Sequence, residues 1–226
     1  MTLSLPDGTS SRPTEVCPGK VLCIGRNYAA HVREMGGSAL PEAPVVFLKP
    51  TTALVPSGGC VVIPAMSDNV HHEVEIVVVI GTGGKHIAEA DALGHVAAYA
   101  LGLDMTARDI QAAAKAKKAP WSVAKGFDTF APLGPLTPAA EVADPQALDL
   151  ALTINGETRQ AGTTAHMIFS VAEIVAYCSR VFTLEPGDLI YTGTPEGVGQ
   201  VHPGDVLEAT GTGLQPLRVT VEAEIA

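Results

Sequence analysis

The sequence predicts a mostly β domain with α-helical insertions, an α+β fold. Short apolar runs bounded by Gly and Pro recur along the chain, as is typical of strands joined by tight turns. A Pro-Gly-Asp turn occurs twice, in "EPGDLIYTG" and "HPGDVLEA", and each copy stands directly before an apolar run. Helix signals are confined to a few segments. Many short strands with few helices indicate one mostly β domain without an internal boundary.

The first elements are a strand and a short helix. "KVLCIG" (20–25) is the expected strand, and it leads into "RNYAAHVREMGG" (26–37), where Asn27 can cap a helix that Gly36-Gly37 ends. A helix of barely two turns is marginal alone, so tertiary contacts or a bound ligand must hold it. "VVFLKP" (45–50) and "CVVIP" (60–64) follow as strands bounded by Pro.

The stretch "HHEVEIVVVIG" (71–81) begins with charge and continues as an apolar run. From Val74 onward it is typical of a strand buried on both faces. Because side chains alternate across a strand, Glu73 and Glu75 project to the same side about 7 Å apart, with His71 in the same row. Two like charges at the start of a buried strand require neutralisation.

A second apolar run changes into a helix. In "HVAAYALGLDMTARDIQ" (95–111), Thr106 and Asp109 resemble a capping box, which places Asp104 at a strand-to-helix corner. The helix in "ARDIQAAAKAKKA" (107–119) ends before Pro120.

The next elements are a hairpin and a further helix. Asn155-Gly156 is a strong turn signal that joins "LDLALTING" to "ETRQAG". Ser170 and Glu173 form a second expected capping box. The apolar face of that helix consists of Val171, Ile174, Val175, Cys178 and Val181.

Composition indicates a well-buried soluble protein and argues against several classes of partner. Of the 226 residues, 46% are hydrophobic and 17% are charged, which supports one sizeable core. The net charge is −10, and Lys115, Lys117 and Lys118 form the only cluster of basic residues, so we expect no nucleic-acid partner.

No membrane or export segment is expected. The apolar runs are too short to span a bilayer, and the N-terminus lacks the pattern of a signal peptide. Cys17, Cys23, Cys60 and Cys178 form no C-x-x-C pair, which favours free thiols in a reducing cytoplasm.

Asp104 can join Glu73 and Glu75 as a third carboxylate at a strand terminus. Three carboxylates in a partly buried cleft repel one another unless protons or a cation neutralise them, and such oxygen ligands suit Mg²⁺, Mn²⁺ or Ca²⁺. His71 and His72 are alternative ligands, although packing beside the site is the preferred interpretation. The alternative for the Glu pair is a solvated strand entrance without function.

Other candidate residues are a His-Glu pair and two lysines. His31 and Glu34 are three residues apart on the short helix, so Glu34 can orient the imidazole for deprotonating water. A solvated surface pair is the alternative. Lys49 and Lys125 stand in apolar settings, where each can point a cation into a cleft or extend to the surface.

The segment "YTGTPEGVG" (191–199) is not a nucleotide loop. It lacks the Gly-Lys-Ser/Thr ending of a P-loop, and no G-x-G-x-x-G follows a strand. Thr192 and Thr194 can offer donors to a small carboxylate, or the glycines serve only a tight turn.

Six motifs, taken in order, resemble one enzyme family. They are "GRNYAAHVREMG", "FLKP", "HHEVE", "GLDMTARDIQ", "AKGFDTFAPLGP" and "GDLIYTGTPEGVG". In order and spacing they resemble the fumarylacetoacetate hydrolase family, in its short acylpyruvate hydrolase and oxaloacetate decarboxylase branch. The match runs from about residue 20 to the C-terminus, so residues 1–19 are expected to be a polar lead-in and 20–226 a single catalytic domain.

The resemblance implies a mixed β-roll, a homodimer and one Mg²⁺ or Mn²⁺ per subunit held by Glu73, Glu75 and Asp104. It implies catalytic roles for His31, Glu34 and Lys125. The implied substrate-binding residues are Arg26, Tyr28, Lys49, Arg108, Gln111 and Thr194.

The implied reaction is carbon–carbon bond cleavage of an acylpyruvate (a 2,4-dioxo acid), fumarylpyruvate included, to pyruvate and a carboxylic acid. His31 and Glu34 would activate water, while the metal and Lys125 would stabilise the enolate. Oxaloacetate decarboxylation fits the same site. The alternatives are a hydroxymuconate-type isomerase or decarboxylase of aromatic catabolism, and a non-catalytic metal-stabilised binding protein.

Overall fold

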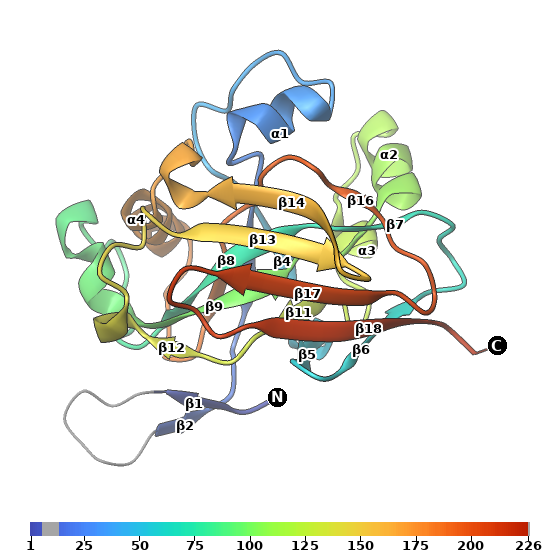
Figure 1. The fold of residues 1–226 in the computed structure, drawn as a ribbon. Coiled ribbons are helices and arrows are strands. Elements are labelled where there is room, and N and C mark those ends of the chain that lie inside the picture. Colours follow the sequence, from blue (N-terminus) through green and yellow to red (C-terminus); the bar gives the residue numbers. More distant parts are fainter. Residues whose placement is uncertain (6–13, 226) are drawn as a thin grey trace.

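A computed structural model describes residues 1–5 and 14–225 and confirms the mostly β fold (Figure 1). The eight-stranded sheet runs β4 (Val45–Lys49), β3 (Val21–Gly25), β15 (Leu189–Tyr191), β8 (Val74–Ile80), β9 (Val96–Leu103), β11 (Ala131–Leu133) and β5 (Leu54–Pro56), with β12 (Thr137–Pro138) paired to β9. The five-stranded sheet runs β14 (Glu157–Thr163), β13 (Asp149–Ile154), β17 (Val206–Gly211), β18 (Leu217–Ala223) and β6 (Cys60–Ile63).

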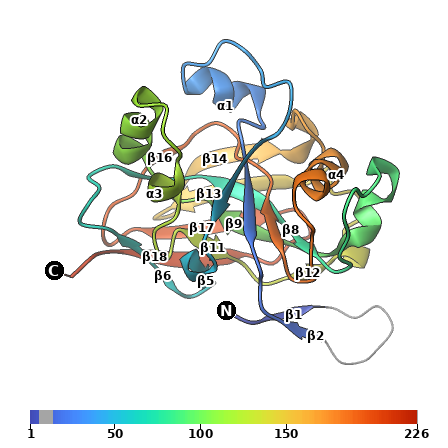
Figure 2. The same ribbon diagram turned by 180° about the vertical axis from the view of Figure 1, so that it is seen from behind.

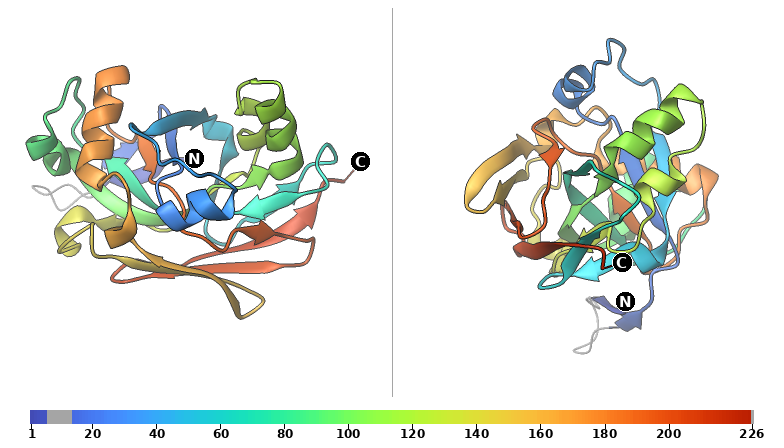
Figure 3. Two further views of the ribbon diagram at one scale, coloured as in Figure 1. Left: turned by 90° about the horizontal axis from the view of Figure 1, so that it is seen from above. Right: turned by 90° about the vertical axis from the view of Figure 1, so that its right-hand side faces the viewer.

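Smaller elements surround these two sheets (Figure 2). The short strands are β10 (Thr106–Ala107), β7 (Val70–His72) and β16 (Gly199–Gln200) in one sheet, and the hairpin β1 (Leu3–Leu5) and β2 (Thr14–Val16). The α-helices are α1 (Ala29–Glu34), α2 (Arg108–Ala116), α3 (Ser122–Lys125) and α4 (Val171–Val181). The 3₁₀ turns are η1 (Thr51–Ala53), η2 (Glu89–His95), η3 (Ala139–Glu141) and η4 (Thr164–His166). Seen from above, α1 lies between α4 and α2 (Figure 3).

The apolar run of β8 is continuous because both of its faces are buried. Ile76 and Val78 point into a large cluster shared with the five-stranded sheet, and Val77 and Val79 point into a second cluster on the opposite face. The expected core is thus divided by the eight-stranded sheet. Leu3 and Leu5 of the N-terminal lead-in are buried in the second cluster, which its polar character did not predict.

Several local predictions are confirmed. Asn155 and Gly156 both have positive φ and close the β13–β14 hairpin, as a type I′ turn requires. Ser170 and Glu173 form the reciprocal capping box of α4, whose apolar face is buried except for Val181, which is 55% exposed. The four cysteines are free thiols.

Two capping predictions were wrong. Asn27 is fully buried, and its side-chain amide donates to the carbonyl groups of Phe169 and Thr192, so α1 has no side-chain cap. The Thr106 hydroxyl donates to the Asp104 carbonyl instead of capping α2. A tertiary contact uses the Asn27 amide, and a bond to the backbone two residues earlier uses the Thr106 hydroxyl, so neither group is available as a helix cap.

The pairing of β8 with β9 positions the acidic side chains. Val74 is opposite Leu103 in this antiparallel pair, so the residues one step further, Glu73 and Asp104, also face one another. The Asp104 N–H donates to the Glu73 carbonyl over 2.8 Å. Asp104, 31 positions after Glu73 in the sequence, thereby reaches the start of β8.

Within residues 1–5 and 14–225, no helix is long and apolar enough to cross a membrane.

Candidate active site

Glu73, Glu75 and Asp104 converge on one point. Each offers a carboxylate oxygen, and the three oxygens lie within 4.8 Å of one another. All three residues are buried. Glu73 and Glu75 share a face through strand alternation, and the β8–β9 register brings Asp104 to them, as the sequence predicted.

Three cations surround two of these carboxylates. Lys125 Nζ bridges Glu73 Oε2 at 3.0 Å and Asp104 Oδ2 at 2.6 Å, and Lys49 Nζ lies 2.7 Å from Asp104 Oδ1. Arg108 forms an ion pair with Glu73. Burial alone would raise the pKa of Glu73, but Lys125 and Arg108 outweigh it and hold that pKa below its usual range. Burial would lower the pKa of Lys125, but Asp104 and Glu73 raise it.

Among the residues that the structure describes, no cation forms an ion pair with Glu75. Its carboxylate accepts a hydrogen bond from the Gly193 N–H at 2.8 Å. Burial, followed by the charges of Asp104 and Glu73, raises the pKa of Glu75 well above its usual value. Gly193 has a φ of +100°, and a Cβ there would meet Asn27 Cβ at 2.7 Å, so glycine is required for this donor.

The donor set fits a divalent metal ion. All three ligand atoms are carboxylate oxygens, which suit hard cations such as Mg²⁺ and Mn²⁺. In the described part of the chain, buried Asp104 Oδ1 accepts no hydrogen bond despite its contact with Lys49. Glu75 forms no ion pair with a cation of the described residues, and its ionisation is disfavoured in the metal-free site. A cation among the three would satisfy both groups.

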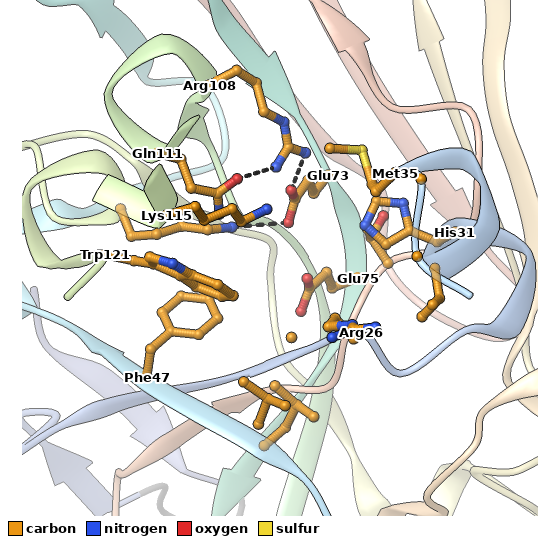
Figure 4. A pocket seen from close by; sticks show the side chains of 18 residues that line it. Arg26, His31, Met35, Phe47, Glu73, Glu75, Arg108, Gln111, Lys115 and Trp121 are labelled. Atoms are coloured by element: carbon orange, nitrogen blue, oxygen red, sulfur yellow. Dashed lines mark hydrogen bonds and ion pairs between the residues drawn. The ribbon is translucent and has the colours of Figure 1, made fainter. Parts of the chain in front are cut away.

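A cavity of about 400 Å³ opens over Glu73 and Glu75 (Figure 4). This volume suits a small organic ligand. Helix α1 contributes His31 and Val32, and Met35 follows directly after it, while α2 contributes Arg108 and Gln111 from another side. Phe47 of β4 and Trp121 pack edge to face in its wall.

Glu34 makes two contacts that fix α1. Its Oε2 lies 3.1 Å from His31 Nδ1, and its Oε1 accepts the Gly197 N–H at 2.9 Å. Because a carboxylate only accepts, the pair places the imidazole proton on Nδ1 and leaves Nε2 as a base. Gly197, at a φ of +95°, lies so close to the Arg159 carbonyl that a Cβ would reach 2.4 Å. The short helix is therefore held by tertiary contacts.

The residues expected to bind substrate divide into two groups. Arg26, Arg108, Gln111 and Thr194 line the cavity. Lys49 and Tyr28 are not in its wall, contrary to expectation.

The positions of these two residues have separate physical reasons. Lys49 is buried behind Asp104 and donates to the carbonyl groups of Met105 and Lys125. The Tyr28 backbone pairs with Met167, and its ring lines a second cavity beside β13 and β14.

Sequence reasoning missed the groups that orient the acids. It interpreted Gly193 and Gly197 as a turn or an anion loop, whereas their N–H groups bind Glu75 and Glu34. Gln160 was also missed, because nothing local in β14 distinguishes it. Its amide joins His72 and Thr194 at 2.9 Å and 2.8 Å, which makes His72 a packing residue.

The fold and site define a class: a mostly β protein in which a buried triad of oxygen ligands and a His-Glu pair both contribute to one cavity through Glu73, Glu75 and His31. The family model "Fumarylacetoacetate (FAA) hydrolase C-terminal" matches residues 20–222. The chain belongs to the fumarylacetoacetate hydrolase family, as its motifs predicted.

Curated relatives and solved structures agree with this assignment. The chain is 50% identical over 202 residues to mitochondrial oxaloacetate tautomerase FAHD1 of Rattus norvegicus, covering 89% of this chain and 91% of the relative. A fumarylpyruvate hydrolase structure from Pseudomonas aeruginosa, in complex with Mn²⁺ and pyruvate, is 42% identical with a TM-score of 0.89, covering 99% and 96% of the two chains. A 5-carboxymethyl-2-hydroxymuconate delta-isomerase from Mycobacterium smegmatis is 41% identical with a TM-score of 0.83, covering 93% and 81%.

Proposed function

We propose that this protein is a Mg²⁺- or Mn²⁺-dependent hydrolase that cleaves a carbon–carbon bond in 2,4-dioxo acids (acylpyruvates), releasing pyruvate and a carboxylic acid. The observation that supports this is the His31–Glu34 pair, because the His31 imidazole lines the same cavity as Glu73 and Glu75 of the metal-ligand triad. Metal binding alone would not need an oriented general base. This pair therefore disfavours a non-catalytic, metal-stabilised binding protein.

Each residue has a separate task in this proposal. A divalent ion on the triad would supply a Lewis acid for the 2-oxo and carboxylate oxygens. His31 Nε2 removes a proton from water, whose oxygen adds to the distal carbonyl carbon, and Glu34 keeps Nδ1 protonated. The bond between C3 and that carbon then breaks, and C3 takes a proton to give pyruvate. Lys125 stabilises the developing negative charge, and α1 restricts bulk water.

Oxaloacetate tautomerisation is the second candidate, supported by the relative at 50% identity. It needs the same enolate stabilisation but moves only a proton, as hydroxymuconate-type isomerisation also does. Decarboxylation of oxaloacetate requires no water nucleophile either. The proposal further includes a homodimer and a cytoplasmic location, although the name of the rat relative describes a mitochondrial protein.

A substrate panel tests the proposal. Acetylpyruvate, fumarylpyruvate, oxaloacetate and a hydroxymuconate are each supplied with Mg²⁺ or Mn²⁺, and pyruvate release and tautomer absorbance are followed. We expect pyruvate from a 2,4-dioxo acid, and loss of turnover after chelation that returns when metal is added. Tautomerisation or isomerisation without pyruvate release would reject the hydrolase assignment in favour of the second candidate.

Changes at the His-Glu pair should affect hydrolysis more than oxaloacetate decarboxylation. His31→Ala is expected to lower the kcat of hydrolysis by about 10²–10⁴-fold and to affect oxaloacetate decarboxylation less, since only hydrolysis needs activated water. Glu34→Gln can still accept the Gly197 N–H, but its amide can donate to Nδ1 and move the imidazole proton to Nε2. It should therefore impair hydrolysis with little loss of thermal stability. Equal losses in both reactions would contradict water activation by His31.

A further inference from the structure

Helix α2 presents a polar row to the cavity that extends beyond the expected substrate residues. Arg108, Gln111 and Lys115 are spaced i, i+3 and i+7, so they occupy one face of the helix, and all three line the cavity. Seven residues span about 10 Å along a helix axis, and long side chains lean back toward its N-terminus. The row thus places three polar side chains along one wall of the cavity.

Lys115 differs from the other lysines of this site because no carboxylate neutralises it. Lys49 and Lys125 form ion pairs with the triad, whereas the Lys115 ammonium forms no hydrogen bond or ion pair with any residue of 1–5 and 14–225. Partial burial of its side chain and then the neighbouring Arg108 guanidinium lower the pKa of Lys115, while Glu73 acts in the opposite direction and the residue as a whole stays exposed. A substrate anion beside the ammonium would raise this pKa.

Trp121 holds the Lys115 ammonium toward the cavity (Figure 4). Nζ lies 5.2 Å from the indole centroid, a cation–π contact that orients the charge without neutralising it.

The exposed Arg26 also lines the cavity, where its guanidinium donates only to the Ala39 carbonyl among the described residues. Lys49, Lys125 and Arg108 already match the three carboxylates in number. Arg26 and Lys115 therefore leave an excess of positive charge.

We propose that Lys115, held by Trp121, is a specificity-determining residue that binds a second carboxylate at the far end of the substrate. The substrate class is then a dicarboxylic oxo acid, with one carboxylate beside its oxo group at the triad and the other at the Lys115 ammonium. Phe47 and Trp121 provide an apolar wall for the carbon chain between them. This inference deepens the proposed function and rests on oxo-acid binding at the same site.

Matched pairs of inert oxo acids test the second carboxylate without any bond cleavage. 2-Oxoglutarate is compared with 2-oxopentanoate, and 2-oxoadipate with 2-oxohexanoate, because each pair differs only in its terminal group. Dissociation constants are measured by calorimetry with Mg²⁺ present. We expect wild type to bind at least one diacid about fivefold more tightly than its matched monoacid, the scale of a solvent-accessible ion pair. Equal affinity within both pairs overturns the proposal.

Variants then assign the preference to Lys115. Lys115→Met should abolish the preference for the diacid and leave monoacid affinity unchanged, Lys115→Glu should reverse it, and Lys115→Arg should retain it. Lys117→Met is the control, since Lys117 is exposed on the same helix end and does not line the cavity. If Lys115→Met weakens diacid and monoacid equally, the residue does not recognise the second carboxylate.

Failure of this inference is distinguishable from failure of the proposed function. An enzyme that binds diacids through Lys115 but releases no pyruvate from any 2,4-dioxo acid would retain the inference and reject hydrolysis. Suppose instead that wild type and Lys115→Met cleave acetylpyruvate with the same kcat/KM, and that they also cleave fumarylpyruvate with the same kcat/KM. That result would retain hydrolysis and reject the inference.

Discussion

Replacement of Glu75 by Gln is expected to lower turnover by about 1,000-fold while leaving the metal-free protein at least as stable as wild type. The loss follows because a metal ligand is removed, and Lewis-acid catalysis supplies several kcal/mol. Stability is retained because Glu75 has no cationic partner, and Gln keeps an oxygen that can accept the Gly193 N–H. Turnover, and the rise in melting temperature on adding Mg²⁺, are the two measurements.

The stability of the Glu75→Gln variant should also depend on pH in a defined direction. The folded pKa of Glu75 is raised above its unfolded value, so its ionisation destabilises the folded state once the pH exceeds the unfolded pKa of about 4.3. Gln removes this penalty. We therefore expect the variant to gain stability over metal-free wild type at neutral pH, and the gain to disappear below about pH 4.

Glu73→Gln is the matched comparison. It should also abolish turnover, but it leaves Arg108 and Lys125 without a charge that both contact, so the metal-free fold should lose stability. Two isosteric changes in neighbouring carboxylates thus have the same catalytic effect and opposite effects on unfolding. If Glu75→Gln still shows the full thermal shift with Mg²⁺, Glu75 is not a ligand.

The features that could be predicted from the sequence are those that depend on residues close together along the chain. Alternation along one strand placed Glu73 and Glu75 on the same side, and the turn at Asn155-Gly156 and the cap at Ser170 depend on neighbours within a few residues. Antiparallel pairing then brought in Asp104, which the sequence marked only as the end of an apolar run.

Contacts between distant segments could not be predicted in this way. The Asn27 amide could form a helix cap or bridge two loops, and only the position of Phe169 and Thr192 decides between them. Lys49 has the same ambiguity, since an apolar setting is compatible with a surface, a cavity wall or a buried ion pair. The packing of distant segments against one another selects among these contacts. The spacing of residues along the sequence carries no information about that packing.

Lys125→Met is expected to destabilise the metal-free protein by about 3–5 kcal/mol, because it leaves Glu73 and Asp104 facing one another in a buried site without the charge that bridges them. The folded pKa of Lys125 is raised, so the stability it contributes is fully present below its unfolded pKa of about 10.4 and would be lost only at higher pH. The deficit should therefore be visible at neutral pH in chemical denaturation, with Lys117→Met as the exposed control.

Metal ions should restore part of this lost stability, and that response separates charge compensation from simple packing. Lys125 and a divalent ion both neutralise Glu73 and Asp104, so removing the lysine should increase the stabilisation that saturating Mg²⁺ confers relative to wild type. Turnover should stay low even with the fold restored, since the metal already acts in the wild-type enzyme and does not also replace the Lys125 ammonium beside the developing enolate. A Lys125→Met variant that gains no more stability from Mg²⁺ than wild type would show that the lysine and the metal do not act on the same carboxylates.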